Sequence, residues 1–430
     1  MFMKSYFPAL WSVPSLRIFF RWLLLICCIS VATGLIVSLF LILLHRVTLF
    51  RFSHPWLLYF LPFAGVLIHY IYQTVGKSSE KGNDLILEEI HRPVGSMTWK
   101  MAPVILISTL ITHLFGGSAG REGTAVQIGG SIASVFGKWF NMSGRDTKTV
   151  LIAGIAAGFG AVFGTPFTGA IFAIEVLTLG KIHYKHFPAA LLASMAGHFT
   201  VMTLHVHHTG YLVNNLPVEF YYLSGRLAFS WLLLGKVMLA AVAFGMVSML
   251  FIKLGHGIKQ LITGVVQRKW LIPLLGGFVI IALTLILGKP DFLGLGIESA
   301  YPGAVTLPSA FLPGGADTWS WLWKTIYTAI TLATGFKGGE VTPLFYIGAT
   351  LGHTLAQVLQ APESLFAAIG FIAVFAGATK TPLACTVMGL ELFGGAYVVF
   401  FATGCFIAFL CSGRTGIYKA QRNRLAGKYS

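Results

Sequence analysis

The chain has 430 residues, of which 56% are hydrophobic and only 10% are charged, and its mean hydropathy is +0.79. An ordinary soluble domain carries about 25% charged residues, so this composition excludes a soluble fold and indicates that lipid surrounds the protein. The formal charge of +16 has two explanations, namely enrichment of Lys and Arg in short cytoplasmic segments and attraction of anions toward a pore. The basic residues are scattered between apolar runs, which argues against nucleic-acid binding.

The first long apolar run extends from Trp22 to Leu44 and contains no charged residue. A helix that crosses a hydrocarbon core of about 30 Å needs roughly 20 residues. Lys4, Arg17 and Arg21 before the run would also suit a signal peptide, but the run is longer than the usual apolar region of about 7–15 residues. We therefore predict a first transmembrane helix that is retained in the mature protein.

The next apolar segments are shorter. Val126–Phe140 holds fifteen residues, about 22 Å of helix at 1.5 Å per residue. Val150–Phe163 is no longer, and Pro166 follows it. Short apolar segments interrupted by Gly and Pro, at matching places in two halves of a chain, indicate a mid-membrane binding site in a transporter built from repeats.

Such a repeat is visible. Gly120–Thr124 (GREGT) resembles Gly338–Thr342 (GGEVT), and the intervals from Glu122 to Glu175 and from Glu340 to Glu391 are 53 and 51 residues. Three further pairs recur in the same order: Gly130 and Gly348, Thr165-Pro166 and Thr381-Pro382, and Glu175 and Glu391. We predict one membrane domain over residues 1–430, with a first pseudo-repeat of about 19–210, a second of about 220–420 and no soluble regulatory domain. The halves should meet near residues 205–225.

The last long apolar run, Leu392 to Gly413, also lacks charged residues and is long enough for a membrane-crossing helix. Basic residues cluster after it as they do before the first run: Arg414, Lys419, Arg422, Arg424 and Lys428. The positive-inside rule therefore predicts that both termini lie in the cytoplasm.

Nothing in the sequence indicates a metal, a cofactor or an enzyme. The five cysteines lie in apolar runs without the paired spacing of metal ligands: Cys27, Cys28, Cys385, Cys405 and Cys411. The cluster His205, His207 and His208 has no acidic or Cys companion nearby, so we do not expect it to bind a metal. There is also no nucleophile–base constellation.

Glu122 carries the most specific chemistry. Its loop, GSAGREGT, precedes a helix that we expect to begin near Ala125 or Val126. Free backbone N–H groups and the positive dipole end of a helix bind anions, and a carboxylate there would compete with a transported ion. Protonation would neutralise the carboxylate and free the place, which makes Glu122 a candidate gate coupled to protons. The alternative is a helix-capping glutamate near the surface. No Gly-Lys-Ser/Thr follows, so a nucleotide loop is disfavoured.

The motifs resemble those of a known family. GREGTAVQIGG is similar to the glycine-framed glutamate motif of CLC chloride channels and proton antiporters. The segments AGIAAGFGAVFGTPFTGAIFAIE, GGEVTPLFYIGATLG and GATKTPLACTVMGLE follow in the order of that family, and Tyr418 falls where its central pore tyrosine belongs. The likeness extends from about Gly82 to Tyr418.

Several positions differ from the pattern of the chloride-transporting members, and these differences indicate which branch of the family the sequence resembles. Asn83 stands where the family's Gly-Ser-Gly-x-Pro motif has its chloride-coordinating serine, and Thr124 replaces a proline. The second half carries Glu340 and Thr342 where chloride-type members have apolar residues, and Val176 where chloride/proton antiporters have an inner proton glutamate. These features resemble the CLC-F branch, the bacterial fluoride/proton antiporters.

The resemblance implies an all-α polytopic membrane protein with two inverted-topology repeats, and a homodimer with one ion path per subunit in the bacterial inner membrane. It implies proton-coupled fluoride export that gives fluoride resistance, with a chloride-selective channel or chloride/proton antiporter as the alternative. Fluoride holds its water tightly, so a dry site must offer strong, directed donors. The expected gate is Glu122, the expected second carboxylate is Glu340, and the expected anion-binding or pore residues are Asn83, Gly120, Arg121, Gly123, Thr124, Thr342 and Tyr418.

The remaining charged groups give weaker signals. Because Glu175 and Glu391 recur in both halves, we expect them to share a structural role, such as hydrogen bonding to neighbouring backbone. Arg121 and Lys337 flank the two motifs, where they either raise the local anion potential or anchor the surface. We expect Asp84 and its neighbours to line an aqueous loop or vestibule.

Overall fold

The structure is a computed structural model and describes residues 13–142, 144–206, 208–211, 213 and 230–423. Within these residues the chain is almost entirely helical. The α-helices of the first half are α1 (Val13–Ser53), α2 (Leu61–Thr74), α3 (Asn83–His91), α4 (Met101–Leu114), α5 (Glu122–Trp139), α6 (Arg145–Phe163), α7 (Pro166–Glu175) and α8 (Phe187–Thr203). Those of the second half are α9 (Trp231–Val265), α10 (Leu271–Leu287), α11 (Ser320–Ala333), α12 (Val341–Leu359), α13 (Glu363–Thr379), α14 (Pro382–Phe393) and α15 (Val398–Cys411).

Helices long and apolar enough to cross a membrane occur in both halves. By length and composition there are four among the described residues: Leu16–Ser53, Pro55–Thr74, Arg145–Phe163 and Trp231–Val265. Most of the other apolar helices, such as α7 with ten residues and α14 with twelve, are too short to cross upright. The prediction of an all-helical membrane protein with short and broken helices is confirmed.

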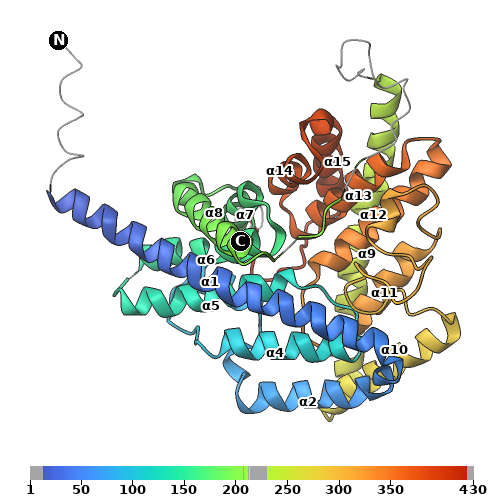
Figure 1. Cartoon of the computed structure of the whole chain (residues 1–430), viewed down its shortest axis with the longest axis horizontal. Coiled ribbons are helices and arrows are strands. Elements are labelled where there is room, and N and C mark those ends of the chain that lie inside the picture. Colours follow the sequence, from blue (N-terminus) through green and yellow to red (C-terminus); the bar gives the residue numbers. More distant parts are fainter. Residues whose placement is uncertain (1–12, 143, 207, 212, 214–229, 424–430) are drawn as a thin grey trace.

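The two halves run through helices of similar length in the same order. α4 and α11 each have 14 residues, and α5 and α12 have 18 and 19. In Figure 1, α5–α8 group on one side of the molecule and α11–α13 on the other, while α1 crosses the first group as a single long helix. α2 packs on α10, and α7 packs on α14, so elements far apart in the sequence join the halves.

The breaks before α7 and α14 have one physical cause. α6 ends where Gly164 takes a left-handed φ of 75°, and α13 ends where Lys380 takes a φ of 63°. Pro166 and Pro382 then open the next helices, because a proline at the first helical turn loses no hydrogen bond there but cannot continue the preceding helix.

Glycines allow the matched helix pairs to pack with backbones in contact. A Cβ on Gly129 of α5 would lie 2.1 Å from the carbonyl oxygen of Gly154 in α6, and a Cβ on Gly348 of α12 would lie 2.0 Å from that of Gly370 in α13. Small residues at such crossings are typical of membrane helix packing.

Several predicted boundaries differ from the structure. α5 begins at Glu122, not near Ala125 or Val126, because Glu122 itself takes part in the first helical turn. α6 begins at Arg145, five residues before the expected apolar start, since polar residues form its first turn. Both helices begin in a polar or charged segment, so a search for uncharged apolar runs could not locate their first residues.

The last apolar run was predicted wrongly as one span. Leu392–Gly413 is divided between the end of α14 and α15, with a 3₁₀ turn at Gly395–Tyr397 between them. Gly394, with φ 88° and ψ 165°, cannot continue a helix. Most of the predicted junction at residues 205–225 lies outside the described residues.

A short strand pair carries the C-terminal segment back to the first half. β1 (Thr178–Leu179) pairs in parallel with β2 (Arg422–Asn423). The segment that contains Tyr418 is therefore held on both sides. Before Tyr418, the N–H of Ile417 donates to the carbonyl of Ala378 in α13 at 2.9 Å, and after it β2 pairs with β1 of the first half.

Candidate functional site

The two repeated motifs cross one another at the centre of the site. Gly120 and Gly339 form an isolated antiparallel bridge, with N–H···O distances of 2.6 and 2.7 Å. The bridge holds the start of α5 beside the start of α12, so the N-termini of two helices from different halves converge on Glu122. The structure thus brings together the motifs that the sequence pairs by similarity.

The Glu122 carboxylate is buried and lies on the N-terminus of α12. Its Oε2 accepts the backbone N–H of Thr342 at 3.0 Å, and the Thr342 hydroxyl lies 2.6 Å from both carboxylate oxygens. The N–H of Arg121 adds a third donor at 3.1 Å, while the Arg121 Nε atom is 3.6 Å from Oε1. Three donors and a helix dipole around one negative group make this an anion site that the protein's own carboxylate occupies.

The sequence predicted a helix N-terminus beside Glu122 but expected that of its own helix. The structure instead uses α12, from the second half, and places Glu122 in the first turn of α5. The contact between Glu122 of the first half and the N-terminus of α12 in the second half depends on the pairing of Gly120 with Gly339. No local sequence pattern predicts a contact between segments so far apart in the chain.

Two glycines of the motif leave room for this arrangement. A Cβ on Gly120 would lie 2.9 Å from Oε2 of Glu122 and 2.9 Å from Cδ of Pro343. A Cβ on Gly123 would lie 3.0 Å from the Cα of Gly339 and 3.1 Å from Nδ2 of Asn83. All four distances are shorter than an ordinary van der Waals contact. A side chain at position 120 would therefore push against the Glu122 carboxylate, and one at position 123 would push against the Asn83 amide.

A cavity of about 140 Å³, here called the Asn83 cavity, is bordered by Asn83 and by Gly338 of the second motif. Asn83, Gln127, Lys337, Glu340 and Tyr418 are among the residues that line it. The buried Oδ1 of Asn83 and Oε1 of Gln127 have no hydrogen-bond partner among the described residues. Polar groups left unpaired in a buried space favour a polar occupant.

A larger space of about 600 Å³ adjoins the Asn83 cavity and is here called the vestibule. The two share Asp84 and Glu340 among their lining residues, and Lys259 and Lys419 also line the vestibule. Glu340 therefore lies where a proton or an ion could pass between the vestibule and the Asn83 cavity. Its carboxylate makes no hydrogen bond to another described residue.

Tyr418 is held in place by the residue beside Asn83. Asp84 accepts the backbone N–H of Ala420 at 3.0 Å, which ties the C-terminal segment to the first turn of α3. Tyr418 itself is buried and lines the Asn83 cavity. The position of its side chain relative to Asn83 therefore depends on Asp84, to which the sequence assigned no specific role.

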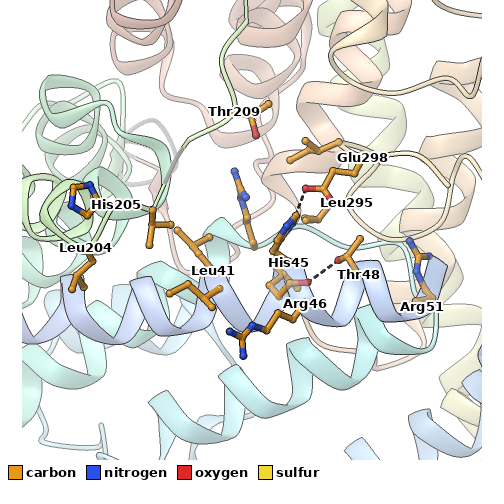
Figure 2. A pocket seen from close by; sticks show the side chains of 16 residues that line it. Leu41, His45, Arg46, Thr48, Arg51, Leu204, His205, Thr209, Leu295 and Glu298 are labelled. Atoms are coloured by element: carbon orange, nitrogen blue, oxygen red, sulfur yellow. Dashed lines mark hydrogen bonds and ion pairs between the residues drawn. The ribbon is translucent and has the colours of Figure 1, made fainter. Parts of the chain in front are cut away.

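A cavity of about 430 Å³, here called the Arg51 cavity, is lined by Arg51 and Arg121 and by the C-terminal part of α1 (Figure 2). Its one acidic lining residue, Glu298, pairs with His45 at 2.9 Å. Glu122 itself lines neither cavity: its neighbour Arg121 lines the Arg51 cavity, and Gly123 on its other side lies beside Asn83.

Thr124, one of the predicted site residues, lines neither the Asn83 cavity nor the Arg51 cavity. The Thr124 hydroxyl is 2.8 Å from that of Thr109 in α4, and both are buried. Gln127, which lines the Asn83 cavity, was missed, although its place one helical turn after Gly123 puts it on the same face of α5. Arg51 was also missed, because a single arginine at the end of an apolar run looks like a surface anchor.

Glu175 and Glu391 cap helices of the opposite half in a reciprocal way. Glu175 accepts the N–H groups of Leu383 and Ala384 at 3.0 and 2.7 Å, at the start of α14. Glu391 of α14 accepts the N–H groups of Phe167 and Thr168 at 2.9 and 2.7 Å, at the start of α7. These contacts fit the expected structural role.

The histidine cluster is divided by the limits of the structure. His205 lines the Arg51 cavity, and His207 lies outside the described residues. Within the described part of the chain, no group of three His, Cys, Asp or Glu side chains could hold a metal ion.

Comparison with known proteins agrees with this architecture. Residues 64–413 match the family model of the voltage gated chloride channel. A chloride/fluoride channel protein of Pseudomonas syringae pv. tomato is 40% identical over 413 residues, which cover 94% of this chain and 86% of that protein. The H(+)/Cl(-) exchange transporter ClcA of Klebsiella pneumoniae is 28% identical over 71% of this chain and 64% of its own length.

Solved structures show the same fold. A CLC-type fluoride/proton antiporter superposes with a TM-score of 0.86 at 31% identity, covering 96% of this chain and 99% of that one. A cyanobacterial Cl-/H+ antiporter superposes with a TM-score of 0.75 at 15% identity over 93% and 96% of the two chains, which supports the fold alone. The resemblance seen in the motifs is confirmed, and the chain belongs to the CLC family of voltage-gated chloride channels.

Proposed function

We propose that the protein exports fluoride in exchange for protons, with Glu122 as the moving gate. The observation that carries the proposal is that the carboxylate of Glu122 lies on the donors of Thr342, while its neighbours Arg121 and Gly123 lie beside the Arg51 cavity and beside Asn83 respectively. An anion that reached this place would meet the same N–H and hydroxyl donors. The carboxylate and the transported ion therefore compete for one site, and only one of them occupies it at a time.

The protonation state of Glu122 decides whether its side chain or the anion occupies the site. A neutral carboxylic acid binds the Thr342 donors and the dipole of α12 less strongly than a carboxylate does. Each proton taken up by Glu122 thus frees the site for an anion, and each proton released returns the side chain to it. This cycle links anion movement one way to proton movement the other way.

The donors around the path favour fluoride over chloride. The Thr342 hydroxyl, the Asn83 amide and the Tyr418 hydroxyl can replace the water that a small, strongly hydrated anion gives up. The CLC-type fluoride/proton antiporter and the chloride/fluoride channel protein resemble this chain more than the chloride exchangers do, at 31% and 40% identity against 28%. A chloride channel or chloride/proton antiporter is the alternative.

Glu340 supplies a second protonation point on the side of the Asn83 cavity. It lines both this cavity and the vestibule, and its Oε2 lies 3.9 Å from the position of a Cβ on Gly123. A proton that arrives from the vestibule reaches Glu340 before it reaches Glu122. Glu340 would thus do the work of the inner glutamate that Val176 replaces.

We further propose that the chain is one membrane domain of two inverted repeats, about 19–210 and 220–420, and that two copies form a homodimer with one path each. The crossing of Gly120 and Gly339 and the reciprocal caps of Glu175 and Glu391 support the repeat. Lys81, Lys259 and Lys419 line the vestibule, which by the positive-inside rule faces the cytoplasm of a bacterial inner membrane together with both termini.

Flux from liposomes tests the choice of ion. Purified protein is reconstituted with potassium fluoride or potassium chloride inside, and efflux is followed with ion-selective electrodes while a pH electrode records proton uptake. We expect fluoride efflux far above chloride efflux, together with proton uptake. Equal efflux of the two halides would refute fluoride selectivity and favour the chloride alternative.

The gate has its own test. Glu122→Gln keeps the size of the side chain but cannot exchange a proton, so fluoride-driven proton uptake should disappear. Glu391→Gln is the matched control, because this half-buried glutamate caps a helix and lines neither of the two cavities. Unchanged proton uptake in Glu122→Gln would remove Glu122 as the coupling residue.

A further inference from the structure

The Arg51 cavity contains a buried positive group with no acidic partner. Arg51, at the end of α1, is 8% exposed, and its Nε atom has no hydrogen-bond partner among the described residues. No Asp or Glu of the described chain forms an ion pair with it. Its guanidinium also lies 5.0 Å from the centroid of the Phe52 ring, an interaction much weaker than the cost of burying a guanidinium.

A second buried cation lies on the other side of the same loop. Lys324, 0% exposed, donates to the carbonyls of Phe292 and Gly294 at 3.1 and 2.7 Å. The guanidinium of Arg51 lies 3.0 Å from the position that a Cβ on Gly294 would take. Lys324 thus holds the loop through two carbonyls while Arg51 lies beside Gly294, and neither basic side chain forms an ion pair with a described Asp or Glu.

The nearby acids have other partners. Asp291 accepts the Tyr301 hydroxyl and the N–H of Val305 at 3.0 Å. Glu298 pairs with His45 at 2.9 Å (Figure 2). Neither lies within ion-pair distance of Arg51, so the positive charge in this part of the cavity is uncompensated within the described chain.

The loop between the cations presents free donors. Gly294 and Gly296 take left-handed φ of 60° and 75° with Leu295 between them, and alternating backbone conformations of this kind occur in the loops that bind anions through successive N–H groups. The N–H groups of Leu295 and Ile297 donate no hydrogen bond within the described chain. Leu295, Gly296, Ile297 and Arg51 all line the Arg51 cavity.

We propose that Arg51 and the backbone of residues 294–297 form a binding site for a small inorganic anion, separate from the Glu122 site. Fluoride and the other halides fit its chemistry, since each is compact, singly charged and bound by N–H donors and a guanidinium. Lys324 is a positioning residue, which fixes the loop through the carbonyls of Phe292 and Gly294. Binding here does not depend on proton coupling at Glu122.

The direct test locates the anion. Crystals of the full chain are soaked in sodium bromide, and anomalous scattering is measured. We expect a bromide peak within hydrogen-bond distance of the Arg51 guanidinium and of the N–H of Leu295 or Ile297. Absence of a peak there, at bromide concentrations that give peaks elsewhere in the protein, would overturn the proposal.

Two variants distinguish specific binding at Arg51 from the presence of an adventitious ion only. In Arg51→Gln the bromide peak should vanish, and the number of fluoride ions bound per chain in equilibrium dialysis should fall by one. Arg46→Gln is the matched control: this arginine is on the same helix and lines the same cavity but is exposed (Figure 2), so both readouts should stay as in the unmodified chain. A peak and a fluoride count unchanged in Arg51→Gln would mean an adventitious ion only and would overturn the proposal.

Two measures keep the result interpretable. If Arg51→Gln does not fold, Arg51→Lys keeps the charge but loses the forked donors, and should weaken fluoride binding at this site at least tenfold. If liposomes show no proton-coupled fluoride flux while the bromide peak is present, the proposed function fails and the anion site stands.

Discussion

Replacing Thr342 by Val should uncouple fluoride movement from proton movement. The substitution removes the hydroxyl, which lies 2.6 Å from both oxygens of the Glu122 carboxylate, and keeps nearly the same volume. The backbone N–H of residue 342 remains at 3.0 Å. The carboxylate therefore loses one of its three donors, and its hold on the site weakens.

The size of the effect follows from one charged hydrogen bond, because a hydroxyl proton serves one oxygen at a time. Such a bond contributes about 1.5–3 kcal/mol, and every 1.4 kcal/mol is a factor of ten in an equilibrium constant. The population with the carboxylate in place should thus fall roughly 10- to 150-fold relative to the open state. Fluoride that passes while the site is open carries no proton, so the number of fluoride ions per proton should rise.

The assay records fluoride efflux and proton uptake in the same liposomes and compares their ratio. The ratio is used because the hydroxyl also serves as a donor to fluoride, so its loss can lower the total rate. Thr342→Ser is the matched control: it keeps the hydroxyl and should keep the ratio of the unmodified protein. A ratio in Thr342→Val equal to that of Thr342→Ser, with fluoride flux still measurable, would refute the idea that this hydroxyl holds the gate.

Three further predictions test the surroundings of the gate. Gly123→Ala should nearly abolish fluoride flux in a folded protein, because the added Cβ would lie 3.1 Å from Nδ2 of Asn83 and 3.0 Å from the Cα of Gly339; flux near that of the unmodified protein would contradict this crowding. Asp84→Ala should lower fluoride flux several-fold and speed proteolysis after Lys419, since Ala420 loses its acceptor at 3.0 Å, whereas Asp84→Asn should preserve both; equal behaviour of the two variants would show that the bond does not position Tyr418. Glu175→Ala should lower the melting temperature in detergent, because two backbone N–H groups lose a charged acceptor worth about 1.5–3 kcal/mol, while the fluoride-to-proton ratio stays constant; a changed ratio would mean that Glu175 takes part in coupling.

The sequence was informative where a short motif determines local structure. The GREGT and GGEVT motifs, the Thr-Pro breaks and the paired carboxylates predicted which segments correspond, and the structure places Gly120 against Gly339. Each of these signals is carried by residue types with few alternatives, such as a glycine at a backbone crossing or a proline at a helix start.

Other features depend on contacts that no local pattern encodes. The N-terminus on which Glu122 lies belongs to α12, and Asp84 reaches Ala420 across 336 positions of the chain. The nearness of Arg51 and Lys324 was not predicted, because both lie against the backbone of residues 292–296, whose sequence contains no charged or polar side chain. The break at Gly394 was missed because apolar composition reports burial in lipid and not helix continuity.

The arrangement of carboxylates in the two halves itself identifies the functional pair. Glu175 and Glu391 are satisfied reciprocally, each on the helix start of the other half, as expected of parts that hold the halves together. Glu122 and Glu340 occupy matching motifs but differ: Glu122 is bound to the N-terminus of α12, whereas Glu340 faces Gly123 in the first turn of α5 without a hydrogen bond to another described residue. If the two halves were fully symmetric, both the Glu122 and the Glu340 carboxylates would accept hydrogen bonds from a helix N-terminus. The start of α12 is occupied by the Glu122 carboxylate, and the Glu340 carboxylate lies close to the start of α5, beside a cavity in which two buried amide oxygens are unpaired. An incoming anion or proton can therefore gain hydrogen bonds at this pair of carboxylates. The coupling reaction should be sought between Glu122 and Glu340.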